Sequence, residues 1–220
     1  MFKKIMGSCL IALSISSAAL AEETKLFRDY SYGMSKEAVQ KLSEGKPCAD
    51  KNLQGSICTP HFIKFSGMEW EQAFIIQNNI LVSVILAKRT EPQDITKIAS
   101  AVINNGFILF LITSHNNINR FDTIEYLNKH GEKNFDADVL KFESSANGNI
   151  SYLLIDSKSA NTAKGKTQIN SVYDILQNSP EDTRGVEIKV NDGITSIQFI
   201  APVKFFSDMG KTIQEAKDSF

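Results

Sequence analysis

Two cysteines, Cys48 and Cys58, lie in the stretch KPCADKNLQGSIC and are the first side chains whose type and spacing could do chemistry. A zinc site needs four ligands in paired clusters, and the only further candidate nearby is His61. A redox-active pair usually has the spacing C-x-x-C, which this stretch lacks. In an oxidising compartment the same thiols would form a structural disulfide that pins a loop. The choice therefore depends on where the chain resides.

The first 21 residues have the pattern of a secretory signal peptide. Two lysines precede a short apolar run, and small residues follow as far as Ala21. This run is too short to cross a bilayer of about 30 Å, and the A-x-A-like end is typical of a cleavage site. A lipoprotein signal would end at Cys9, but no apolar core precedes that residue. We expect cleavage near Ala21, a periplasmic or secreted location, and hence a disulfide between Cys48 and Cys58.

The chain that remains after cleavage has 22 basic and 25 acidic residues, a net charge of −3. This near balance gives no large electrostatic footprint for nucleic acid or an anionic membrane. No later segment has 18 consecutive apolar residues, so we expect no transmembrane segment. The 199 residues from Glu22 onward are enough to bury a core as one domain or two small ones.

Histidines and serines show no catalytic pattern. His61, His115 and His130 are each isolated in the sequence, and none belongs to an H-x-x-x-H or H-E-x-x-H motif. The nucleophile elbow G-x-S-x-G of serine hydrolases is also absent from the sequence. We therefore expect structural or surface roles for the histidines, no catalytic residue among them, no metal site and no cofactor.

Glu69 and Glu71 flank Trp70 in the run MEWEQ. Alternation along a strand would place both carboxylates on one face, roughly 7 Å apart, with Trp70 on the other. Such a pair could act as the acid and base of a glycosidase. A solvated sheet face opposite a buried tryptophan explains the same pattern and is the interpretation that we favour.

Aromatic side chains are the candidates for contact with another molecule. Tyr30, Tyr32 and Trp70 lie in the first third of the chain, and Phe205 and Phe206 follow Pro202. Exposed aromatic residues anchor many protein interfaces, whereas buried ones are ordinary core. With 14 phenylalanines in the chain, most of them must be buried, and we favour the core role.

The elements that must position these residues are helices and short strands in alternation. Helices are expected at 35–45 with Ser35 as N-cap and Gly45 as left-handed C-cap, at 92–105, at 119–131 between Asn119 and Gly131, at 169–176, and at 206–220. Strands are expected at 61–66, 70–77, a central one at 80–88, and at 107–113, 139–144, 149–156, 185–190 and 194–201. Asn147-Gly148 and Asp192-Gly193 are hairpin signals, and 157–168 has the composition of a loop.

These elements predict an α+β fold, with antiparallel strands, helices packed on one face, and helix-plus-hairpin units. We divide the chain into a signal peptide at 1–21, a helix-plus-sheet unit with the disulfide loop at 22–90, and an α+β continuation at 91–220 that can belong to the same domain.

One family resemblance is carried by the N-terminal unit. The helix start Gly33-Met34-Ser35, the Gly45-x-Pro47 end, and the strand with Leu81 and Val84 resemble the exported modules of the BamE (SmpA/OmlA) outer-membrane-assembly lipoproteins and of the β-lactamase inhibitor protein. The resemblance covers about 60 residues. It implies a unit that works by contacting other proteins and that brings no catalytic residues with it.

The sequence thus predicts a non-enzymatic binding or protein-interaction module of the bacterial cell envelope, whose partner is another envelope protein. Two alternatives stay open: an envelope hydrolase that uses dispersed carboxylates such as Glu69 and Glu71, and a small-ligand carrier with an apolar cleft.

Overall fold

The computed structural model describes residues 23–114, 119–146 and 148–208. The expected signal peptide, His115, Asn147 and the end of the expected C-terminal helix, 209–220, lie outside these residues. Within the described part, no helix is long and apolar enough to cross a membrane.

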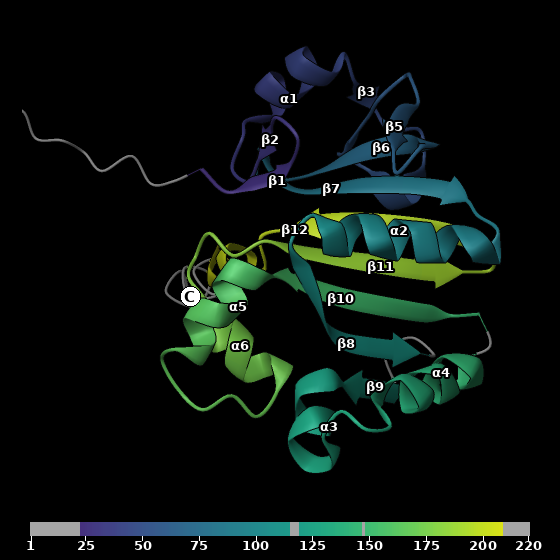
Figure 1. Ribbon diagram of the computed structural model, residues 1–220. Helices are drawn as coiled ribbons and strands as arrows, with labels where there is room; N and C mark the ends of the chain where they lie inside the picture. The colour runs from purple at the N-terminus through teal and green to yellow at the C-terminus, as the bar shows by residue number, and fades with distance from the viewer. Residues whose placement is uncertain (1–22, 115–118, 147, 209–220) are drawn as a thin grey trace, which may run out of the picture.

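Most of the described chain is built on one antiparallel sheet (Figure 1). Its ten strands are β3 (Lys46–Pro47), β4 (Ile57–Cys58), β5 (Ile63–Phe65), β6 (Met68–Gln77), β7 (Ile80–Arg89), β8 (Phe107–Ser114), β9 (Asn119–Asp122), β10 (Ile150–Asp156), β11 (Gly185–Asn191) and β12 (Ile194–Ile200). They lie in the order β3-β4-β6-β7-β12-β11-β10-β8-β9, with β5 beside β6. A separate pair is formed by β1 (Lys25–Phe27) and β2 (Tyr30–Ser31).

The described helices are mostly short. They are α1 (Lys36–Ser43), α2 (Pro92–Asn104), α3 (Thr123–His130), α4 (Phe135–Ser145), α5 (Ser157–Lys164) and α6 (Val172–Asn178), with a 3₁₀ turn at Lys51–Leu53 and a helical segment at 202–208. Together with the antiparallel sheet they confirm the predicted α+β class.

Helices cover both faces of the sheet, and neighbouring side chains of β10 pack into different cores on the two faces. Leu154 joins the main core with Ile98 and Val102 of α2, whereas its neighbour Ile155 joins a second core with Ile175 of α6. Adjacent residues of a strand point to opposite faces. We call the side of α2 and α4 the first face and the side of α5 and α6 the second face. The sequence led us to expect the helices on one face, whereas the structure places them on both.

The strand expected to be central is β7. It pairs with β6 on one side and with β12 on the other, where the register runs from Ser83↔Ile200 to Arg89↔Ile194. Because β7 precedes residue 91 and β12 follows it, the two parts that we separated at 90 share one sheet.

Other expectations are confirmed at the element level. Ser35 caps α1 by accepting a hydrogen bond from the N–H of Ala38 at 3.2 Å, and α2 begins at Pro92. The second hairpin, β11 and β12, turns at Asp192-Gly193, where both residues have positive φ.

The prediction of a strand at 139–144 was wrong, because α4 covers these residues. Val139 and Phe142 are three positions apart and pack with Ile150 in a core of the first face, while Leu140 remains 61% exposed. Val139 and Phe142 fit one face of a helix, whereas Leu140 and Phe142 fit the alternation of a strand. No hairpin forms here, since a helix rather than a strand precedes β10.

The prediction of a loop at 157–168 was also wrong for its first eight residues, where α5 forms. Asp156 caps this helix, and its Oδ1 accepts a hydrogen bond from the N–H of Ser159 at 2.9 Å. Ala160 and Ala163 are completely buried, so small side chains let the helix pack closely on the second face.

Two helix ends differ from the expectation. Residues 119–122 form β9, and the cap of α3 is Asp122 rather than Asn119, although Gly131 ends the helix as predicted. At the end of α1 the left-handed residue is Glu44 rather than Gly45. Gly45 is needed for space instead, because a Cβ there would lie 2.3 Å from Cγ2 of Ile57.

Candidate functional site

A row of polar side chains crosses the second face of the sheet. The register pairs Arg120 of β9 with Thr113 of β8, Thr113 with Ser151 of β10, and Ser151 with Lys189 of β11. Residues directly opposite each other in antiparallel strands project on the same side. We call these four residues the polar row. Its two ends are the cations Arg120 and Lys189, and its middle is formed by the hydroxyl groups of Thr113 and Ser151.

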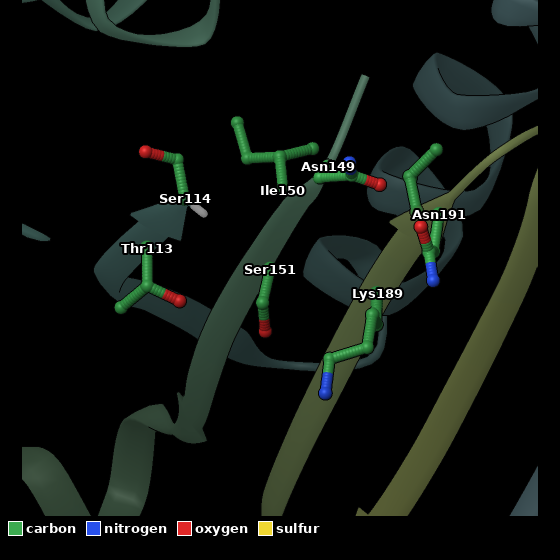
Figure 2. A pocket seen from close by; sticks show the side chains of 8 residues that line it. Thr113, Ser114, Asn149, Ile150, Ser151, Lys189 and Asn191 are labelled. Carbon is green, nitrogen blue, oxygen red and sulfur yellow. The ribbon is translucent and has the colours of Figure 1, made fainter. Parts of the chain in front are cut away.

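Three members of the polar row, Thr113, Ser151 and Lys189, line an open hollow of about 450 Å³ (Figure 2), whereas Arg120 lines a second hollow. Figure 2 shows Thr113, Ser151 and Lys189 extending from three neighbouring strands, with Asn149 and Asn191 at the strand ends. Hydroxyl, amide and ammonium groups therefore dominate this hollow, which we call the polar hollow.

A second hollow, of about 340 Å³, adjoins the first and shares Thr113 and Ser151 with it. Its lining is largely apolar and comes from the sheet, α6 and the segment 202–208: Leu111, Leu153, Val172, Leu176, Ile200 and Pro202. Tyr173 and Phe206 stand at its rim and are 55% and 61% exposed, so the hollow is open to solvent. We call this the apolar hollow, and the two hollows together the groove.

The charges of the groove have a small positive excess. Lys189 lies 3.7 Å from Glu187, whose Oε1 also accepts a hydrogen bond from the hydroxyl of Ser151 at 2.5 Å. The guanidinium of Arg120 lies 5.9 Å from the ring centre of Tyr173. Two cations thus face one carboxylate among the residues that line the groove.

A further ion pair lies just beyond Arg120, on α3. Lys129 contacts Glu125 at 2.6 Å, and this hydrogen bond, with a smaller effect from Arg120, lowers the pKa of the Glu125 carboxyl. Glu125 is therefore a partner of Lys129, and Arg120 makes no ion pair within 4 Å in the described part of the chain.

One buried carboxylate holds α6 in place over the groove. Oδ1 of Asp122 accepts hydrogen bonds from Ile124 and Glu125 in the first turn of α3, at 3.0 and 3.1 Å. Oδ2 accepts the N–H of Val172, the first residue of α6, at 2.9 Å. Asp122 therefore fixes both helix starts beside β9, and the apolar side chains of α6 face the sheet.

A second aspartate has the same double role for α5. While Oδ1 of Asp156 caps that helix, Oδ2 accepts the N–H of Arg184 at 2.8 Å, just before β11. The two carboxylates anchor the helices of the second face to the strands that carry the polar row.

The predicted cysteine pair lies far from the groove along the sheet. The Sγ atoms of Cys48 and Cys58 are 2.12 Å apart, at the distance of a disulfide. Cys48 precedes the 3₁₀ turn and Cys58 ends β4, so the bond closes the loop between β3 and β4.

The five aromatic candidates are not brought together. Trp70 is completely buried and donates its Nε1–H to the carbonyl of Phe65 at 3.0 Å, and Tyr30 is also in the core. Tyr32 is half-buried; its hydroxyl donates to Asp208 at 2.8 Å, and burial raises its pKa above the usual range. Phe205 is partly buried. Phe206 alone among the five is exposed and borders the groove.

The carboxylate pair and the described histidines do not form a cluster. Glu69 and Glu71 are both exposed on β6. Glu71 borders a third hollow, of about 260 Å³, beside His61 and Cys58. His130 is at the end of α3, where the negative end of the helix dipole lies. No group of three His, Cys, Asp or Glu among the described residues could hold a metal ion.

The sequence did not identify Arg120, Tyr173 or Lys189 as members of a site. Arg120 was assigned to a helix, and the row depends on the pairing register of four strands from distant parts of the chain. The alternation of β11, with Glu187 and Lys189 on one side and Val186, Ile188 and Val190 on the other, was the available signal that this face is polar.

Comparison with known proteins found no match: no family model, no curated protein and no solved structure resembles this chain closely enough to indicate a family.

Proposed function

We propose that this chain is an exported, non-enzymatic binding module of the bacterial cell envelope, and that it binds through the groove. Export is inferred from the leader pattern at 1–21, and the Cys48–Cys58 pair is compatible with an oxidising compartment.

The observation that carries the proposal is the apolar hollow with its rim. Tyr173 and Phe206 are each more than half exposed beside a concave surface formed by aliphatic side chains. Exposed aromatic rings next to an apolar pocket are typical of the central contacts of protein interfaces. A folded chain has no need to leave two large rings in solvent at the same place.

Another envelope protein is the partner that we propose. The N-terminal unit resembles exported modules that contact other proteins, and Arg and Tyr side chains, both present in the groove, are common at interface centres. The hydrolase alternative has less support, since Glu69 and Glu71 are both exposed on β6 and no group of three His, Cys, Asp or Glu in the described part of the chain could hold a metal ion. A small-ligand carrier is the second candidate, because about 340 Å³ lies within the range of ligand pockets.

Affinity capture from envelope extract tests the proposal. Phe206→Ser and Tyr173→Ser should reduce retention of the partner by about tenfold or more, as loss of an interface aromatic commonly does. Phe62→Ser is the matched control, because Phe62 is 64% exposed but lies away from the groove. Equal retention by Phe206→Ser and the unchanged chain would rule out the groove as the binding surface.

A further inference from the structure

We propose that the groove binds a single-chain amphiphile with an anionic head, whose chain lies in the apolar hollow and whose head lies on the polar row. This inference rests on the proposal that the groove is the binding site, and adds the chemical class of a ligand.

The first argument is the abrupt change of polarity along the strands. Leu111 and Leu153 face the apolar hollow, and each is two residues from Thr113 and Ser151 of the polar row. Two residues along a strand span roughly 7 Å. A ligand that fills both hollows must therefore change from apolar to polar within a few bond lengths, which is the property of an amphiphile.

The second argument is the charge at the polar end. Arg120 and Lys189 stand at opposite ends of a row that crosses three strand spacings, about 14 Å between their backbones. Both side chains are long enough to approach one anion placed over Thr113 and Ser151. Glu187 offsets one of the two cations. It also accepts the hydroxyl hydrogen of Ser151, so this hydroxyl does not donate to the head, and recognition of the head depends on the remaining positive charge.

The third argument is the nature of the floor. The backbones of β8, β10 and β11 are paired with neighbours on both sides along the groove, so they offer no free strand edge to an extended peptide. An alkyl chain needs no hydrogen-bond partners and gains about fourfold in affinity for each methylene group it buries. The observations therefore favour an alkyl chain over an added peptide strand inside the apolar hollow, while a folded protein partner would contact the exposed rings of Tyr173 and Phe206.

Isothermal titration calorimetry of the purified full chain tests this inference, with sodium dodecanoate as the probe below its micelle concentration. Dodecyl maltoside and dodecyltrimethylammonium carry the same chain with an uncharged and a cationic head. We expect one dodecanoate per chain, binding about tenfold more tightly than the cationic probe. Decanoate should bind roughly fifteenfold more weakly than dodecanoate, because two methylene groups are lost.

Variants separate the head from the chain. Arg120→Ala and Lys189→Ala should each weaken dodecanoate binding about tenfold and leave dodecyl maltoside nearly unchanged. Phe206→Ser should weaken all probes that bind. Arg89→Ala and Phe62→Ser are the matched controls, exposed residues outside the groove, and should change nothing.

The outcomes distinguish this inference from the proposed function. Absence of dodecanoate binding, or equal binding of the anionic and cationic probes, overturns the anionic amphiphile even when an envelope protein is retained through Phe206. Selective dodecanoate binding that is lost in Arg120→Ala supports the inference, and does so whether or not a protein partner is captured. Stoichiometric binding that survives both Arg120→Ala and Lys189→Ala would place the ligand elsewhere and overturn the assignment.

Discussion

At the scale of single residues, the groove depends on groups that the sequence does not distinguish. Asp122 looks like any surface aspartate in the run NRFDTIEY, yet it is buried and joins the start of α3 to Val172, which lies 50 residues further along the chain. The cysteine pair could be predicted, because the expected compartment and the spacing of the two residues favour a disulfide without knowledge of the fold. The members of the polar row could not, because a shift of one residue in any strand would move each side chain to the other face.

Asp122→Asn should destabilise the chain by about 1–3 kcal/mol, because an amide offers one acceptor oxygen where three N–H groups, that of Val172 buried, now share two. Urea unfolding followed by circular dichroism measures the change. Asp192→Asn is the control, since Asp192 is exposed in a turn with positive φ that asparagine also adopts. Equal stability of the two variants would mean that Asp122 does not hold α3 and α6.

At the scale of elements, the sequence identified those with a clear period or a clear cap. The helix from Pro92 has a regular apolar period, and the hairpin at Asp192-Gly193 has a clear turn signal. Both elements are present in the structure. The run 139–144 is short and has only three apolar residues, so their spacing does not decide between helix and strand. Packing against the core of the first face decides for a helix. In α5 the small polar and alanine residues carry no visible apolar stripe, and only the tertiary contacts of Ala160 and Ala163 reveal its buried side.

The strands β3 and β4 have two residues each, so the loop between them relies on the disulfide. Replacement of Cys48 and Cys58 by serine should cost about 2.5–3 kcal/mol of unfolding free energy, the entropy of freeing a loop of this length. Binding in the groove should be unchanged, because β8 to β11 are separated from β4 by other strands.

Unfolding curves with and without dithiothreitol check this, and the double variant should no longer respond to the reductant. Loss of binding at unchanged stability would instead indicate that the thiols take part in function.

At the scale of the whole molecule, the sheet decides which parts depend on each other. The sequence predicted the antiparallel α+β class, because that class follows from element type and order. It could not predict that β12, near the end of the described chain, lies between β7 and β11. The N-terminal unit, which ends with β7, and the groove, whose lining begins at Ile200 of β12, therefore meet at the β7–β12 pairing within one hydrogen-bonded sheet.

Residues 22–90 alone should therefore not fold into a stable unit, although they carry the short motifs from which we predicted an exported module. Without β12 the fragment loses the backbone pairing along Ser83–Arg89 and exposes β7 as a long apolar edge, which favours aggregation. It also loses the ring of Phe199, which lies 4.6 Å from that of Phe27 in the main core. Circular dichroism and size-exclusion chromatography of the fragment, beside the chain 22–220, measure the outcome. A monomeric fragment with a sharp, cooperative unfolding transition would show that the N-terminal unit is an independent module, as the resemblance implies, and that the shared sheet is not needed for its stability.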